Sequence, residues 1–171
     1  MIPDDVTPPS MEEARRAHSS GFNRVGDGVY RLVHRVEGSH WVYKYGSCEV
    51  NRYEVAELNR VRLELAVATD FEWMRLPEAV LMEDPHFLAM EYIHREGPDW
   101  NWCDYYVCEN PYCRRHRIEN EFNLEDLHQA NVILNDEIIY PVDLGGSRWH
   151  HECCEGFDDP MEEMLKDMER G

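Results

Sequence analysis

The sequence predicts an α+β protein with a mainly antiparallel sheet. Three observations lead to this class: β-favouring runs succeed one another across tight turns, one long amphipathic run interrupts them, and a last pair of short strands encloses polar residues. The length of 171 residues is that of one domain, and 43% hydrophobic residues are enough for a core. We therefore expect one folded unit with short appendages.

The N-terminal third of the chain predicts an arm, a short helix and a hairpin. The arm covers 1–21, begins with ten residues that include three prolines, and contains a helix over 11–19. Gly26-Asp27-Gly28 predicts a turn before a strand over 29–36. A second strand over 40–45 follows the turn at 37–39, which completes the hairpin.

The middle of the chain predicts one helix and two further strands. Apolar residues recur at three- and four-residue spacing over 50–68, which is typical of an amphipathic helix. Strands are expected over 79–82 and 87–93, around a turn that contains Pro85.

The last third is irregular before it becomes regular again. Residues 94–122 are rich in Trp, Tyr and Cys and show no clear period. Short strands are expected over 132–134 and 138–142, and an acidic helix over 160–171. The apolar side of this helix is expected to dock on the body, or else on a partner chain.

Charge restricts the partners. The chain carries 35 acidic and 17 basic side chains, a net charge of −18, and no basic stripe. Nucleic acid is therefore not an expected partner, because its phosphates are bound by clustered cations. No apolar run approaches the length of a membrane helix, and the N-terminus lacks the order of a signal peptide, so we expect a cytoplasmic acidic protein. The acidity serves solubility or a salt-rich cytoplasm, and composition does not separate the two.

Lysine is scarce: only Lys44 and Lys166 accompany fifteen arginines. Lys44 lies within a β-favouring apolar run, Trp41 to Tyr45. One interpretation is an edge-strand lysine that faces water. The other is a compact point charge at a position where the planar fork of arginine does not fit.

Three oxygen-bearing side chains surround the last predicted hairpin. Asn131 follows Asp126 by five residues, and Asp143 comes twelve residues later, before Leu-Gly-Gly. Carboxylate and amide oxygens suit Mg²⁺ that also contacts substrate phosphates. An Asp just before such an Asn can orient a hydroxyl for attack on a phosphoryl group. The alternative is that all three residues cap turns or strand ends.

These motifs resemble the protein-kinase-like superfamily, in particular its aminoglycoside-phosphotransferase-like branch, in which Asp-Leu-His-x-x-Asn is a frequent form of the catalytic loop. The resemblance covers 22–149 in collinear order. It implies Asp126 as the catalytic aspartate, Asn131 and Asp143 as Mg²⁺ ligands, and Lys44 as the lysine on the ATP phosphates. The glutamate that holds the lysine would be Glu54, with Glu57 as the alternative.

The resemblance also implies a nucleotide pocket and two lobes. Met90 would flank the adenine, residues Glu91 to Ile93 would offer backbone hydrogen bonds, and Gly26 and Gly28 would belong to a reduced glycine-rich loop. An antiparallel β N-lobe with one helix would span 22–93 through the hinge. A shortened, mainly helical C-lobe with the catalytic loop and the acidic tail helix would span 94–171.

The chain departs from the family in two ways. Leu124-Glu125 precedes Asp126 where the family has a basic residue, so regulation through a phosphorylated activation segment is not expected. Only residues 94–125 separate the hinge from the catalytic loop, and only 28 residues (171 − 143) follow Asp143. The alternatives are a minimal active kinase, an ATP-binding pseudokinase, or a lobe completed by a partner.

The cysteines present a separate candidate site. The side chains of Cys103, Cys108, Cys113 and His116 supply four soft ligands, enough for tetrahedral Zn²⁺. Alternatively, helical spacing buries these cysteines as small apolar residues. A second His/Cys cluster at 150–154 could share the same ion. Without a signal peptide, a disulfide framework is not expected.

The functional expectation is thus a phosphotransferase that uses Mg²⁺ and ATP, with a protein Ser/Thr or a small-molecule hydroxyl as acceptor. The alternative is a non-catalytic nucleotide- or protein-binding module of the pseudokinase type. A structural zinc ion at the cysteine site would stabilise such a module.

Overall fold

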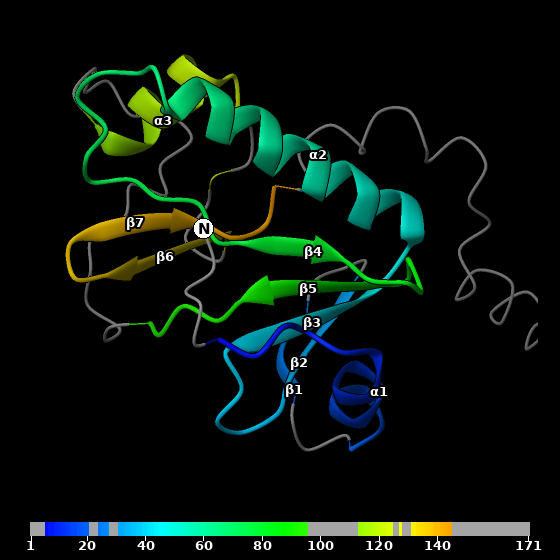
Figure 1. The fold of residues 1–171 in the computed structure, drawn as a ribbon. Coiled ribbons are helices and arrows are strands. Elements are labelled where there is room, and N and C mark those ends of the chain that lie inside the picture. Colours follow the sequence, from blue (N-terminus) through cyan, green and yellow to red (C-terminus); the bar gives the residue numbers. More distant parts are fainter. Residues whose placement is uncertain are drawn as a thin grey trace, which may run out of the picture.

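The structure is a computed structural model of the chain, and it describes residues 6–20, 24–27, 31–95, 113–124, 127 and 131–144. Within these ranges it contains three α-helices and seven strands (Figure 1). In chain order they are α1 (Met11–Ser19), β1 (Arg24–Asp27), β2 (Arg31–Arg35), β3 (Trp41–Gly46), α2 (Cys48–Leu65), β4 (Ala79–Leu81), β5 (Phe87–Glu91), α3 (Arg114–Phe122), β6 (Val132–Asn135) and β7 (Ile138–Pro141). None of these helices has the length and apolar character of a membrane span.

Five strands form an antiparallel sheet in the order β1-β2-β3-β5-β4, and β6 and β7 form a separate antiparallel hairpin. The predicted α+β class with an antiparallel sheet is therefore confirmed. β3 lies at the centre of the sheet, between β2 and β5. Lys44 pairs there with Val33 on one side and Leu88 on the other, so it is not an edge-strand residue.

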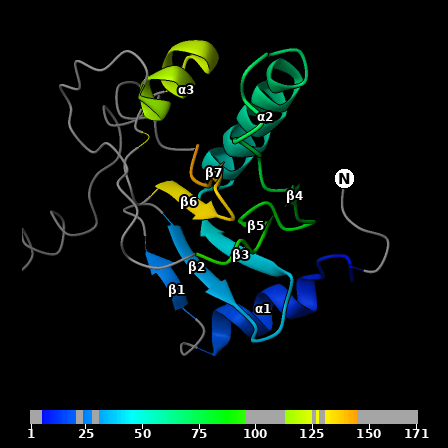
Figure 2. The ribbon, with the colours of Figure 1, turned by 90° about the vertical axis from the view of Figure 1, so that its left-hand side faces the viewer.

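The helix α1 covers one face of the sheet (Figure 2). Its first turn is capped by the Ser10 side chain, which accepts from the Glu13 N–H at 3.2 Å. Ala14 and Ala17 are fully buried against Trp41, whose indole N–H donates to the Thr7 carbonyl at 2.8 Å. Residues 7–19 of the predicted arm thus pack on the sheet.

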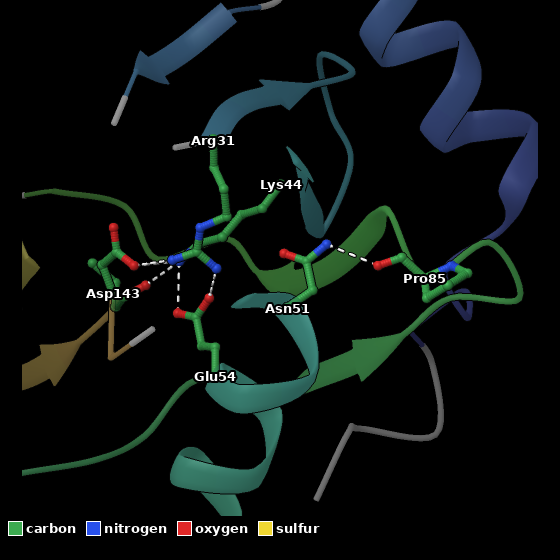
Figure 3. Close-up of polar contacts among 7 residues, drawn as sticks. Arg31, Lys44, Asn51, Glu54, Pro85 and Asp143 are labelled. Atoms are coloured by element: carbon green, nitrogen blue, oxygen red, sulfur yellow. Dashed lines mark hydrogen bonds and ion pairs between the residues drawn. The ribbon is translucent and has the colours of Figure 1, made fainter. Parts of the chain in front are cut away.

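The helix α2 covers the opposite face, where the larger core lies (Figure 2). Asn51 fixes the start of this helix, because its side chain donates to the Pro85 carbonyl in the β4–β5 turn at 3.0 Å (Figure 3). The core contains buried residues from both sides of the predicted lobe boundary at 93/94. Its members are Val42, Leu58, Val61, Phe71, Met74, Leu88, Met90, Ile118, Phe122, Leu124, Leu127, Val132, Ile139 and Leu144.

The β6–β7 hairpin is tied by its backbone to the segment that follows α2. The Ile139 N–H donates to the Trp73 carbonyl at 2.8 Å, and the Arg75 N–H donates to the Ile139 carbonyl at 2.9 Å. Met74 and Ile139 form an isolated parallel bridge between these bonds. The open end of the hairpin, which carries Asn131 and Asp143, is thereby fixed relative to the sheet.

Two predicted elements need correction. Gly26 lies in β1 and pairs with Val33, next to a register shift after Arg24, whereas the sequence predicts a turn at 26–28. The sequence pattern does not distinguish the two positions, because glycine is favoured both in turns and where a strand is irregular. The second correction is α3, within a segment predicted to be irregular.

The sequence pattern does not predict α3, because the buried face of this helix is narrow and includes a charged residue. Arg115, Ile118 and Phe122 are its buried residues, at spacings of three and four. Arg115 also bonds Glu119 one turn later, at 2.7 Å. The predicted tail helix at 160–171 lies outside the described residues.

Candidate functional site

The site is built around Lys44 on β3. Alternate side chains of a strand point to opposite faces, so Lys44 shares the α2 face with Val42, whereas Tyr43 points toward α1. The residue is only 5% exposed. Its Nζ donates to Oε1 of Glu54 at 2.7 Å (Figure 3). The same Nζ also donates to the carbonyl of Val142. The interpretation of Lys44 as a point charge in a confined place matches this environment.

Glu54, rather than Glu57, is the partner of Lys44. It lies in the second turn of α2 and is fully buried. Glu57 lies one turn further on and instead binds Arg60, with oxygen–nitrogen distances of 2.5 and 3.0 Å. The hydrogen bonds that Arg60 donates to the Glu57 carboxylate raise the pKa of Arg60 above its ordinary value. Glu57 is therefore bonded to Arg60, and Glu54 is the glutamate bonded to Lys44.

Asp143 approaches from the end of the last strand. Its Oδ1 lies 3.8 Å from the Nζ of Lys44, and 35% of its side chain is exposed (Figure 3). Asn131 lies beside it along the backbone, since the Val142 N–H donates to the Asn131 carbonyl at 2.9 Å. The closed hairpin thus brings the two predicted Mg²⁺ ligands to adjacent positions at its open end.

These two residues fit a hard divalent cation in donor type and access. A carboxylate and an amide oxygen are ligands that Mg²⁺ accepts, and it ordinarily keeps water and phosphate oxygens as its other ligands. The exposed part of Asp143 leaves room for them. Among the described residues, no group of three or more His, Cys, Asp or Glu side chains could hold a metal without such help. The site therefore suits a metal that arrives with a phosphate-bearing ligand.

Arg31, which the sequence analysis did not single out, completes the cluster. It is 6% exposed, and its guanidinium binds both Glu54 and Asp143 (Figure 3). Burial alone would lower the pKa of Arg31, but the two carboxylates outweigh it and hold that pKa above its ordinary value. Arg31 lies two residues before Val33 on the same strand, so both side chains point to the face of the sheet that carries the larger core.

The predicted hinge is described through residue 95. Met90 is 1% exposed and packs in the core beneath the sheet. The Glu91 N–H donates to the Glu78 carbonyl at 2.8 Å, and the Tyr92 N–H donates to the His40 carbonyl at 2.7 Å. Neither N–H is therefore available to a ligand in this conformation. Ile93 is 8% exposed.

A cavity of about 500 Å³ adjoins this hinge. It is lined by Arg75 and by residues of the hinge and of the β6–β7 hairpin, and its lining contains none of Arg31, Lys44, Glu54 and Asp143. Two of the lining residues are bonded to each other, since the Asn135 side chain donates to the His94 carbonyl at 2.9 Å. The cavity therefore lies apart from Lys44 and Asp143.

Several predicted site residues lie outside the described part of the chain. These are Gly28, Asp126, Cys103 and Cys108. Cys113 is partly buried and directly precedes α3, and His116 lies in the first turn of that helix. The structure thus describes two of the four candidate zinc ligands.

Comparison with known proteins adds no family. No protein-family model matches the chain, and no curated protein sequence is significantly similar to it. The functional argument therefore rests on the sequence motifs and on the geometry of the cluster formed by Arg31, Lys44, Glu54 and Asp143, which we call the charged cluster.

Proposed function

We propose that the chain is a protein-kinase-like phosphotransferase that uses Mg²⁺ and ATP. One observation carries the proposal: the ammonium of Lys44 lies between Glu54 of the long helix and Asp143 after the last strand. Asp143 is distant in the sequence from the other two, and the three residues follow the order and lie on the kinds of element that the resemblance implies for a phosphate-binding lysine, its glutamate and a metal-binding aspartate.

Each residue has a distinct part in this proposal. Glu54 holds the Lys44 ammonium in place, so that it faces the phosphates without searching other rotamers. Asn131 and Asp143 would hold Mg²⁺, which neutralises phosphate charge when bound. Asp126 would orient the acceptor hydroxyl and receive its proton. The acceptor is a protein Ser/Thr or a small-molecule hydroxyl.

A second candidate function is a non-catalytic nucleotide-binding module. It is favoured by the hinge, where the N–H groups of Glu91 and Tyr92 are already bonded within the protein. Fewer hinge bonds for an adenine would weaken nucleotide binding.

The first experiment is a thermal shift with ATP, with and without Mg²⁺, on the wild type and on Asp143→Asn. We expect ATP to raise the Tm of the wild type in a Mg²⁺-dependent manner, because a ligand that binds only the folded state stabilises it. Asp143→Asn should lose the Mg²⁺ dependence. Asp70→Asn is the matched control, since Asp70 is exposed, lies outside the lining of the cavity beside the hinge, and has a left-handed backbone (φ 65°) that suits asparagine.

A wild type that ATP and Mg²⁺ do not stabilise would contradict the proposal. If ATP does bind, turnover separates the two candidates. Phosphate release or autophosphorylation that disappears in Asp126→Asn indicates an enzyme, whereas binding without turnover indicates the module.

A further inference from the structure

We propose that Arg31 sets the order in which ligands enter the charged cluster. Its guanidinium occupies the cation position at Asp143 in the free protein, and a divalent cation enters only together with a polyphosphate. The nucleotide part of this inference rests on the function proposed above, whereas the metal part does not.

The guanidinium of Arg31 lies between the two carboxylates of the charged cluster. Arg31 is the first residue of β2, directly after the segment predicted to cover the phosphates, and it points to the same face as Lys44 (Figure 3). It binds Glu54 with one nitrogen and Oδ1 of Asp143 with the other. The Lys44 Nζ lies 3.8 Å from that same oxygen. Oδ1 therefore already has two cations beside it.

The charged cluster is electrically balanced without a metal. Arg31 and Lys44 contribute two positive charges, and Glu54 and Asp143 contribute two negative ones, so the four side chains sum to zero. A divalent cation added alone would leave a charge of +2 on a cluster in which only Asp143 is substantially exposed. The Coulomb energy of like charges a few ångströms apart is large at low effective dielectric, so metal alone is disfavoured.

A polyphosphate changes both the charge balance of the cluster and the partner of the Arg31 guanidinium. Its negative charge compensates the metal, and the planar guanidinium of Arg31 can exchange a carboxylate for phosphate oxygens in the same forked geometry. Asp143 then becomes available to the metal. Arg31 is thus a phosphate-binding residue in the loaded state and the counter-ion of Asp143 in the free state.

The test measures metal binding directly. Mn²⁺ substitutes for Mg²⁺, and the free Mn²⁺ is followed by electron paramagnetic resonance with no nucleotide present. We expect Arg31→Gln to bind Mn²⁺ at least about tenfold more tightly than the wild type, because the competing cation is gone. The double variant Arg31→Gln/Asp143→Asn should lose this gain. Arg35→Gln is the matched control, since Arg35 lies on the same strand but contacts the Ser39 carbonyl and the Tyr92 ring.

Three results would overturn the proposal. One is wild-type protein that binds Mn²⁺ alone as tightly as it does with ATP, a measurement that needs no variant. The second is Arg31→Gln with unchanged Mn²⁺ affinity, provided that circular dichroism shows it folded; if it is not folded, Arg31→Met, which also removes the competing charge, is measured instead, and its Mn²⁺ affinity should rise likewise. The third is a gain that persists in the double variant.

The outcome is separable from that of the proposed function. If ATP fails to bind the wild type but Arg31→Gln gains Asp143-dependent Mn²⁺ binding, the counter-ion role stands and the phosphotransferase proposal falls. If ATP binds, it should raise the Mn²⁺ affinity of the wild type at least about tenfold more than that of Arg31→Gln. Equal enhancement in the two proteins would reject the role of Arg31 in ordering the ligands.

Discussion

The Nζ of Lys44 lies 3.8 Å from Oδ1 of Asp143, although one residue belongs to the central strand and the other follows the last described strand. Two sets of hydrogen bonds fix this contact. Lys44 donates to the carbonyl of Val142, the residue before Asp143. The β6–β7 hairpin, which ends just before Val142, is bonded through its backbone to the segment after α2. Loss of the lysine or of its partners should therefore affect both ligand binding and stability.

Lys44→Arg tests the need for a compact cation. The charge is retained, but the wider guanidinium does not fit a position that is 5% exposed and already next to Arg31. We expect the Mg²⁺-dependent thermal shift with ATP to be lost. Isothermal titration measures the accompanying loss of ATP affinity in the presence of Mg²⁺, and Arg52→Lys on the exposed side of α2 is the control. Unchanged ATP affinity in Lys44→Arg would contradict a phosphate contact by this residue.

Glu54→Gln should destabilise the protein much more than Glu57→Gln. Glu54 is fully buried between two cations, and removal of a buried countercharge costs about 3 kcal/mol. The partner of Glu57, Arg60, is 34% exposed, so solvent screens that pair and about 1 kcal/mol is expected. Urea denaturation gives both values. Similar losses in the two variants would show that the Lys44 pair is not special.

Leu58→Ala tests the core that both predicted lobes share. Leu58 is 1% exposed, and truncation of a buried leucine costs about 3 kcal/mol. Leu63, on the same helix, is 75% exposed, so Leu63→Ala should change the free energy of unfolding by less than about 0.5 kcal/mol. The loss in Leu58→Ala should be the same by tryptophan fluorescence and by circular dichroism. Two separate transitions would indicate that the sheet and the hairpin unfold independently.

His34 should make the protein less stable in acid. Burial, together with the charges of His18 and Arg24, lowers the pKa of His34 below its ordinary value of 6.5. The folded protein therefore binds fewer protons here than the unfolded chain does. The stability that this residue contributes is fully present above about pH 6.5 and is lost as the pH falls below it.

The measurement is the free energy of unfolding from about pH 8 to about pH 5 in the wild type and in His34→Gln. The variant should show a shallower decline over this range. His86→Gln is the control, because the His86 side chain is 54% exposed. Equal declines in the wild type and in His34→Gln would assign the acid sensitivity to other groups.

Local pattern was sufficient to predict most of the secondary structure. The helix at 11–19, the helical period of α2, and the turns at 37–39 and around Pro85 depend on neighbours in the sequence, and the helices and the strands on either side of these turns are observed. The helix α3 was missed because its burial depends on distant partners. Phe122 packs at 5.0 Å, centroid to centroid, against Phe71, which no local pattern reveals.

For the candidate site, the sequence alone determined residue types and their order: a single lysine in a β-favouring run, a choice of two helix glutamates, and oxygen ligands around a hairpin. Only the tertiary structure decided between Glu54 and Glu57, because one helical turn sets which side chain faces β3. It alone revealed Arg31 as the residue that joins the two carboxylates. The reason is that ion pairing depends on distance through space, and the strand register that brings Arg31 near Asp143 is fixed by packing of the whole sheet.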